Sequence, residues 1–284
     1  VYTFSVSREK YGKHGTGCVL SSAIASYLKL GYPLSEACRH GQQYVAAFIR
    51  SNNTNLGMHN HPAEMKQEVD LHQIPLQYIT DTKEGVSIPE QVEAVCQGGC
   101  RWIQLRMKET GHEEFIRTGR VVKQICEQYG ALFLINDNVD IALELDADGV
   151  HLGKEDMNPL DARRILGYSK IIGGTCNTIE DVIARFHQQV DYIGLGPFTY
   201  TSTKKHLSPI LGIEGYQRIM NTCLEQGITT PIYAIGGIRE ENIAPILKTG
   251  VTGIALSSLL KNSDNITEKT KEIIQKTYEN HRCN

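Results

Sequence analysis

Residues 75–284 are predicted to form a closed (β/α)8 barrel, a fold of the α/β class. Eight short apolar segments recur along this part of the chain, and a helical segment follows each of them. Strands that alternate with helices pair in parallel, and eight such units in about 210 residues suffice to close a small barrel. An open doubly wound sheet is the alternative, but no G-x-G-x-x-G motif follows the first strand, as a dinucleotide-binding sheet would require.

The elements of the barrel can be placed by residue. The expected strands are Leu76–Ile79, Trp102–Leu105, Leu132–Ile135, Gly149–Leu152, Ile171–Gly174, Tyr192–Leu195, Ile232–Ile235 and Gly253–Leu256. The expected helices are Pro89–Cys96, Glu113–Tyr129, Asp140–Leu145, Pro159–Leu166, Ile179–Gln189, Glu214–Glu225, Glu241–Leu247 and Thr267–Tyr278.

The composition excludes several classes of protein. Of the 284 residues 40% are hydrophobic and 21% are charged, as is ordinary for a globular protein. The formal net charge of −3 argues against a nucleic-acid partner. No apolar run reaches membrane-spanning length and no secretory signal opens the chain, so neither a membrane partner nor export is expected. Eight scattered cysteines without a C-x-x-C pair favour reduced thiols and a cytoplasmic protein. The oligomeric state stays open, a homo-oligomer included.

Residues 1–50 are expected to be the end of a separate domain, joined to the barrel by a polar linker at residues 51–74. Two helices are predicted here, at Val19–Leu30 and Leu34–Arg50, and the turn Gly15-Thr16-Gly17-Cys18 opens the first. A glycine-rich turn before a helix can bind phosphate through backbone N–H groups. A tight turn that only packs a helix is the alternative. The chain does not begin with Met, so we expect it to be a piece of a longer protein.

The second strand of the barrel carries three polar side chains at its end. Because side chains alternate along a strand, Gln104, Arg106 and Lys108 are expected to point inward. Cations inside a barrel are costly without an anion, and a phosphate or pyrophosphate would satisfy them. Internal pairing of these cations with Asp137 or Asp156 is the alternative.

Two aspartates follow neighbouring strands. Asp137 comes directly after the third strand, and Asp156 comes shortly after the fourth. Catalytic groups of a (β/α)8 barrel gather at the carboxyl ends of its strands, and two carboxylates there could hold a divalent cation. The alternative is that both residues are helix N-caps, a common role for Asp after a strand.

The later strand ends predict further anion contacts. Thr175 follows two glycines at the end of the fifth strand, and the long loop after the sixth strand contains Thr201, Ser202, Thr203 and Lys204. Long loops of this kind are usually functional. Gly237 follows the seventh strand, and Ser257 and Ser258 follow the eighth, where such barrels recurrently bind phosphate. Two anion sites indicate two phosphorylated substrates or one bisphosphate.

The motifs QLRMK, INDNVDIALELDADGVHLGKED, GLGPFTYTSTK, AIGGI and GIALSS occur in order at the predicted strand ends. Over residues 75–280 the chain thereby closely resembles the thiamine-phosphate synthases. The resemblance implies a TIM barrel and a transferase of thiamine biosynthesis that joins hydroxymethylpyrimidine diphosphate to thiazole phosphate with Mg²⁺. The implied contacts of the pyrimidine diphosphate are Gln104, Leu105, Arg106, Met107, Lys108, Asn136, Thr175 and Lys204, with Arg106, Lys108 and Lys204 assisting catalysis. The implied thiazole phosphate contacts are Thr201, Ser202, Thr203, Gly237, Ser257 and Ser258, and the implied Mg²⁺ ligands are Asp137 and Asp156.

The first segment resembles another family. The run from His14 to Ala25, HGTGCVLSSAIA, is similar to the C-terminal anion-hole segment of the hydroxymethylpyrimidine (phosphate) kinases, which are ribokinase-like. In that family the turn at the positions of Gly15, Thr16, Gly17 and Cys18 faces the phosphate that is transferred, and the resemblance implies an anion-binding turn here. It covers only residues 1–70, without the sheet and substrate loops of the family, so no kinase activity is expected from this chain.

One stretch of the barrel departs from the family pattern. Many members have Ser and then His two residues later, where this chain has Thr175-Cys176-Asn177. Two alternatives to a synthase remain from the sequence: a thiazole tautomerase-like barrel, and a barrel that binds thiamine phosphates without turning them over. A tautomerase would not need Arg106, Lys108, Asn136 and the two aspartates together, so their joint presence favours the synthase.

Overall fold

The computed structural model describes residues 13–29, 32–50, 69–108, 110–167, 169–200 and 209–281. The chain divides into two compact units, Val1–Glu68 and Val69–Asn284, and each is described by itself. Within the described ranges, no helix has the length and apolarity needed to cross a membrane.

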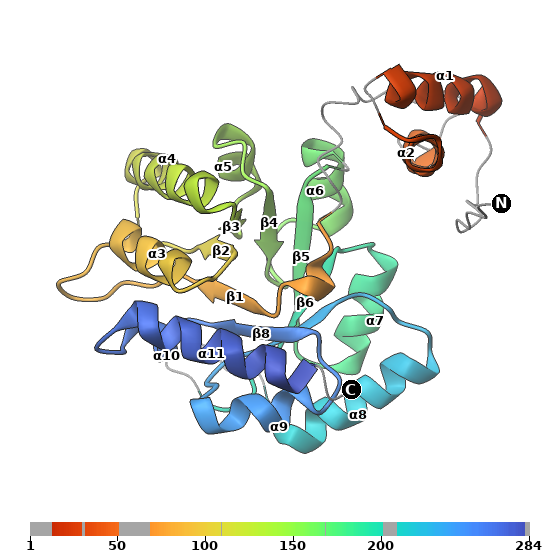
Figure 1. Ribbon diagram of the computed structural model, residues 1–284. Helices are drawn as coiled ribbons and strands as arrows, with labels where there is room; N and C mark the ends of the chain where they lie inside the picture. The colour runs from red at the N-terminus through yellow and green to blue at the C-terminus, as the bar shows by residue number, and fades with distance from the viewer. Residues whose placement is uncertain are drawn as a thin grey trace. The chain divides into compact units, whose positions relative to one another are not determined.

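The first unit contains a pair of helices, α1 (Thr16–Lys29) and α2 (Leu34–Arg50), that pack against each other (Figure 1). Helix α1 begins three residues earlier than the predicted Val19, directly after Gly15, whose φ is +82°. Most of the predicted anion turn is therefore the first turn of the helix. Residues 51–68 of the expected linker lie outside the described residues.

The second unit is a closed barrel of eight parallel strands, as the sequence predicts. Each strand pairs with its neighbours in chain order, and β1 also pairs with β8, which closes the sheet. The strands are β1 (Leu76–Ile79), β2 (Trp102–Leu105), β3 (Leu132–Asn136), β4 (Gly149–Leu152), β5 (Ile171–Cys176), β6 (Tyr192–Leu195), β7 (Ile232–Ile235) and β8 (Gly253–Leu256).

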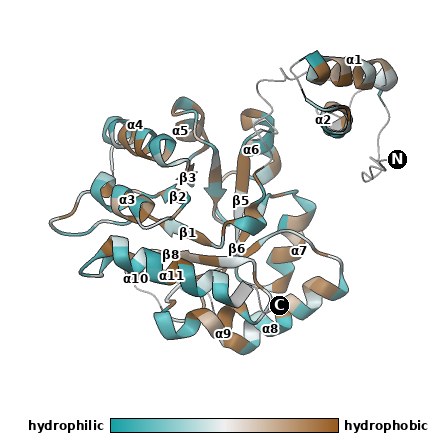
Figure 2. Ribbon diagram, in the orientation of Figure 1, coloured by the Kyte–Doolittle hydropathy of each residue, from teal (hydrophilic) through white to brown (hydrophobic). Residues whose placement is uncertain are grey.

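Helices surround the strands in Figure 1. They are α3 (Ile88–Gln97), α4 (His112–Tyr129), α5 (Val139–Glu144), α6 (Pro159–Leu166), α7 (Ile179–His187), α8 (Gly212–Glu225), α9 (Ile243–Leu247) and α11 (Ile266–His281). Among the described residues, the short helices η2 (Leu71–Gln73) and α10 (Ser258–Lys261) lie outside the predicted set, and the start of the predicted helix Glu241–Leu247 is the separate short helix η3 (Glu240–Asn242). Figure 2 shows hydrophobic and hydrophilic residues mixed along α4 and α8, as expected for helices with one face on a core.

The inside of the barrel is closed at one end by aromatic rings. Trp102 makes edge contacts with Tyr192 and Tyr233, at ring-centroid distances of 4.6 and 4.8 Å, and all three are fully buried. Leu71 of η2 packs against them, and the Tyr233 hydroxyl donates to the carbonyl of Ile74 at 3.0 Å. Residues 69–74, which the sequence places in the linker, thus lie against this floor. Side chains therefore fill this end of the barrel.

Candidate active site

A cavity of about 350 Å³ lies at the carboxyl ends of the strands. Its volume is within the range of small-molecule sites. Most of the predicted site residues that the structure describes line it: Gln104, Arg106, Asn136, Asp137, Asp156, Thr175, Gly237, Ser257 and Ser258.

Three residues predicted to contact the diphosphate lie elsewhere. Leu105 is fully buried in the core between strands and helices, and Met107 packs against that core. Lys108 is exposed and is not among the residues lining the cavity. The predicted alternation fails at Lys108 because β2 ends at Leu105, so the inward row stops at Arg106. The remaining predicted residues, Thr201, Ser202, Thr203 and Lys204, lie outside the described part of the chain.

A pair of amides lies at the inner end of the cavity. The Gln104 Nε2 donates to Asn136 Oδ1 at 2.6 Å, linking the ends of β2 and β3. Gln104 is 1% exposed, and its Oε1 accepts no hydrogen bond from any described residue. A buried acceptor without a donor is costly. This oxygen is therefore suited to a ligand that brings its own N–H, such as an amino-substituted heteroaromatic ring.

Arg106 brings a positive charge into the same cavity. Its Nη1 lies 3.8 Å from Asp81 Oδ1, and its side chain is 16% exposed. Burial lowers the pKa of Arg106, while the nearby carboxylates of Asp81 and Asp137 oppose that shift. The alternative of internal pairing therefore applies in part, with Asp81 as the partner that sequence reasoning missed. An arginine remains charged in such a setting and suits an anionic ligand.

Neither predicted metal ligand caps a helix, so that alternative is wrong. The N-cap of α5 is Asn138, whose Oδ1 accepts from Ile141 N at 2.9 Å. The N-cap of α6 is Asn158. Asp137 has a φ of +67°, a left-handed conformation that costs on the order of 1 kcal/mol for a residue other than glycine. Such strain gathers at functional sites, and both aspartates line the cavity.

The loop that carries Asp156 is fixed from two sides. Asp156 Oδ2 accepts the Gly153 N–H at 2.6 Å, and the Gly153 carbonyl accepts from Arg185 at 2.8 Å. Lys154 of the same loop pairs with Asp181 at 2.7 Å. The second metal candidate is thus held by α7, which contributes Arg185 and Asp181.

The two aspartates fit a magnesium ion that a phosphorylated ligand helps to bind. The described residues contain no cluster of three or more His, Cys, Asp or Glu side chains able to form a complete metal site. Mg²⁺ is typically held by one or two carboxylates together with water and substrate phosphates. For such an ion, Asp137 and Asp156 would supply the carboxylates and the ligand the other oxygens.

A hydrogen-bonded row of buried side chains crosses the barrel and reaches the cavity at His151 and Thr175. Gln77 Nε2 donates to the Tyr192 hydroxyl at 3.0 Å, which is 2.9 Å from His151 Nδ1, and His151 Nε2 is 2.9 Å from Thr175 Oγ1. Burial raises the pKa of Tyr192, so its hydroxyl keeps its proton. In the Nε2–H tautomer of His151, Tyr192 donates to Nδ1 and Nε2 donates to Thr175. The proton of the Thr175 hydroxyl is left for an acceptor in the cavity.

The stretch that departs from the family pattern has a local role. Asn177 is 8% exposed and lines the cavity, and its Nδ2 donates to the Gly196 carbonyl. Its backbone N–H donates to Asp181 Oδ2 at 2.9 Å. In this chain the position therefore joins the end of β5 to the segment after β6.

A second group of anion-binding features lies after β7 and β8. Gly237 has a φ of +69°, and a Cβ there would lie 2.5 Å from the Tyr200 carbonyl oxygen, so only glycine fits. Ser257 immediately precedes α10, and its buried Oγ has no hydrogen-bond partner among the described residues. A phosphate oxygen would satisfy this hydroxyl.

Comparison with known proteins decides the family. The family model for thiamine monophosphate synthase matches residues 76–260, which include all eight strands. A thiamine-phosphate synthase from Flavobacterium psychrophilum is 47% identical over 205 residues, which cover 70% of this chain and 98% of that protein. The chain belongs to the thiamine-phosphate synthase family. A solved thiamine phosphate pyrophosphorylase from Pyrococcus furiosus is similar to it with a TM-score of 0.66 at 32% identity, covering 74% of this chain and 98% of that one.

The first unit has its own match, as its sequence predicts. The family model for phosphomethylpyrimidine kinase matches residues 1–64. A protein of Oryza sativa subsp. japonica named probable thiamine biosynthetic bifunctional enzyme, chloroplastic, is 33% identical over 285 residues. That match covers 93% of this chain and 51% of the rice protein.

Proposed function

We propose that the cavity joins hydroxymethylpyrimidine diphosphate to thiazole phosphate, giving thiamine phosphate and pyrophosphate. One observation carries the proposal. A single cavity combines the amide pair, Arg106 and two aspartates at the ends of β2 to β4 with an unpartnered serine hydroxyl and a glycine turn at the ends of β7 and β8. These two groups suit two phosphorylated ligands that meet between them.

The pyrimidine diphosphate is assigned to the first group. The unpartnered Oε1 of Gln104 suits the amino group of the pyrimidine, and Asn136 holds the Gln104 amide in place. Arg106 and Thr175, which both line the cavity, are assigned to the diphosphate oxygens. Lys204 is assigned to the same diphosphate from the sequence alone. Lys108 is exposed and does not line the cavity, so the proposal does not include it among the diphosphate contacts.

Asp137 and Asp156 would hold Mg²⁺ against the diphosphate. When bound, the ion supplies positive charge that stabilises the departing pyrophosphate. The chain would set the position of this ion, because the Asp156 loop is held in place. Gly153 hydrogen-bonds Asp156 and Arg185, and Lys154 pairs with Asp181.

The chemistry needs no protein nucleophile. The C–O bond between the pyrimidine methylene and the diphosphate breaks, and its electron pair leaves with the pyrophosphate. The resulting cation is stabilised by the electron-rich aminopyrimidine, and the thiazole nitrogen then forms the new C–N bond. Arg106 and the Thr175 hydroxyl stabilise the leaving group, while the cavity aligns the two substrates.

The thiazole phosphate is assigned to the second group. Its phosphate would accept hydrogen bonds from the Ser257 hydroxyl and from backbone N–H groups beside Gly237 and Ser258. Thr201, Ser202 and Thr203 are assigned to the same substrate from the sequence. Both proposed substrate groups line the same cavity, as the joining of the two substrates requires.

The test supplies purified protein with both substrates and Mg²⁺ and measures products over time. We expect thiamine phosphate and pyrophosphate to form in equal amounts, and neither to form when one substrate is omitted. Binding of both substrates without product would instead indicate a barrel that binds thiamine precursors only. Exchange of the thiazole substrate between tautomers, without loss of diphosphate, would indicate a tautomerase.

A further inference from the structure

Asp81 does not line the cavity, yet it contacts cations from the segments that follow β2 and β8, two strands whose ends contribute to the cavity. It follows β1, and its two carboxylate oxygens face different cations. Oδ2 accepts from Lys261 Nζ at 2.8 Å, and Oδ1 lies 3.8 Å from Arg106 Nη1. The side chains of Lys261, Asp81 and Arg106 are 11%, 21% and 16% exposed, so water screens their attraction only weakly.

The residue before Asp81 fixes the backbone of Arg106. Thr80 is fully buried, and its hydroxyl donates to the Arg106 carbonyl at 3.0 Å and accepts the Arg106 N–H at 2.8 Å. Both hydrogen-bonding groups of the Arg106 backbone are thereby used. Of two consecutive residues after β1, Thr80 thus hydrogen-bonds the main chain of Arg106, and Asp81 lies within ion-pair distance of its guanidinium.

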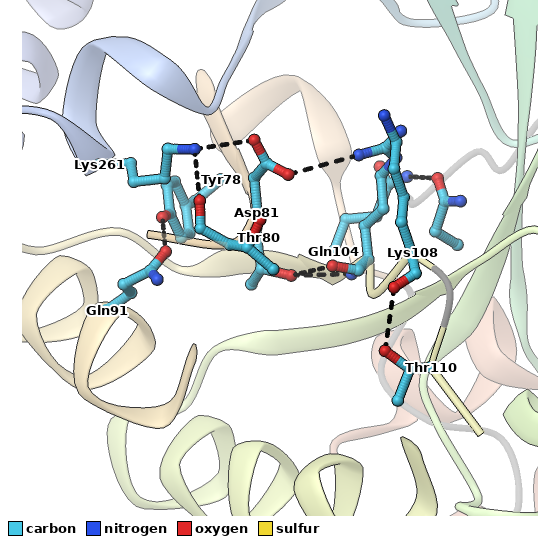
Figure 3. Close-up of polar contacts among 11 residues, drawn as sticks. Tyr78, Thr80, Asp81, Gln91, Gln104, Lys108, Thr110 and Lys261 are labelled. Atoms are coloured by element: carbon cyan, nitrogen blue, oxygen red, sulfur yellow. Dashed lines mark hydrogen bonds and ion pairs between the residues drawn. The ribbon is translucent and has the colours of Figure 1, made fainter. Parts of the chain in front are cut away.

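Lys261, which follows β8, contacts the segment after β1. It is the last residue of α10, and besides Asp81 its ammonium donates to the Thr82 carbonyl at 2.7 Å. Figure 3 shows Lys261 reaching Asp81, with Thr80 between Asp81 and Gln104. Helix α10 begins at Ser258, within the group proposed to bind thiazole phosphate. The first residue of this helix therefore lines the cavity, and its last residue contacts Asp81, the ion-pair partner of Arg106.

We propose that Asp81 is a positioning residue for diphosphate binding, which holds the Arg106 guanidinium in the cavity and is itself held by Lys261. The proposal rests on the proposed function, which assigns Arg106 to the diphosphate. It gives α10 a second role, because the helix that starts at one phosphate group orients the cation of the other through Lys261 and Asp81.

Charge alone and positioning predict opposite signs for one substitution. Asp81→Asn removes a negative charge near the diphosphate, so a purely electrostatic effect would tighten anion binding. Loss of positioning would instead weaken it, on the order of tenfold, a modest cost for a misplaced binding group. The probe is inorganic pyrophosphate with Mg²⁺, and its dissociation constant is measured by titration calorimetry on the intact chain.

A double-mutant cycle tests whether Asp81 acts through Arg106. The variants are Asp81→Asn, Arg106→Gln and both together. We expect the loss from Asp81→Asn to vanish in the Arg106→Gln background. Lys261→Met, which keeps the length of the side chain, should weaken pyrophosphate binding a few-fold in the same Arg106-dependent way. It also serves if Asp81→Asn does not fold.

The matched control is Asp146→Asn. Asp146 also pairs with two lysines, Lys123 and Lys170, but it lies before β4, at the opposite end of the barrel. Its substitution should leave pyrophosphate binding unchanged. Unchanged or tighter binding in Asp81→Asn, or an equal loss with and without Arg106, would overturn the positioning role alone. If Arg106→Gln bound pyrophosphate like the parent, the assignment of Arg106 under the proposed function would fail as well.

Discussion

Asp137→Asn is expected to lower the rate of thiamine phosphate formation at a fixed, limiting Mg²⁺ concentration by on the order of 10²-fold. The substitution removes one of the two carboxylate charges proposed to hold the ion. Asparagine has the same shape and tolerates the φ of +67° at this position, so the change is confined to the charge. Initial rates measured against Mg²⁺ concentration should show a higher concentration for half-maximal rate.

Asp146→Asn is a close control for this experiment. Asp146 is also an aspartate with positive φ, at +45°, but it lies away from the cavity. Its substitution should leave the magnesium dependence unchanged. A variant at Asp137 with the magnesium dependence of the parent would remove this residue from the metal site, whatever its rate.

Arg106→Gln is expected to lower kcat/KM for the pyrimidine diphosphate by on the order of 10²- to 10³-fold, the scale for loss of one preorganised electrostatic group. The guanidinium is proposed to bind the diphosphate and to stabilise the charge that develops on it. The KM for thiazole phosphate should change little, since that substrate is assigned to the ends of β7 and β8. Steady-state kinetics with each substrate varied in turn measures both values.

Arg164→Gln provides the comparison for a charge lost at the surface. The Arg164 side chain is 77% exposed and pairs only with the neighbouring Asp161 among the described residues, at 2.6 Å. Kinetic constants like those of the parent are expected. If Arg106→Gln instead raised the KM of both substrates equally, Arg106 would serve the cavity as a whole and not the diphosphate.

The barrel could be predicted because its strands are short apolar runs separated by helices. Two predicted strands ended before the observed ones, because the last residues of the observed strands are polar or small and were read as loop. Asn136 extends β3 by pairing with His151, and Thr175 and Cys176 extend β5 by pairing with Gly194 and Leu195. A polar residue at a strand end reads as a loop in the sequence, although its backbone still has a partner in the neighbouring strand.

The site was predicted where chemistry is local and missed where it depends on distant contacts. Gln104 and Arg106 line the cavity as strand alternation predicts, whereas Lys108 does not, because it lies three residues beyond the end of β2 at Leu105. The sequence could not show that Asn138, and not Asp137, caps α5. His151 and Tyr192 are 41 residues apart, and only the closed barrel brings their side chains together.

Release of pyrophosphate tests the central claim most directly. Hydroxymethylpyrimidine diphosphate and thiazole phosphate are mixed with the protein, once with Mg²⁺ and once with EDTA, and pyrophosphate and thiamine phosphate are quantified. The account predicts release of pyrophosphate together with thiamine phosphate in the presence of Mg²⁺, and loss of both with EDTA. Equal release with and without Mg²⁺ would contradict the metal site formed by Asp137 and Asp156, and binding without any release would contradict the synthase reaction itself.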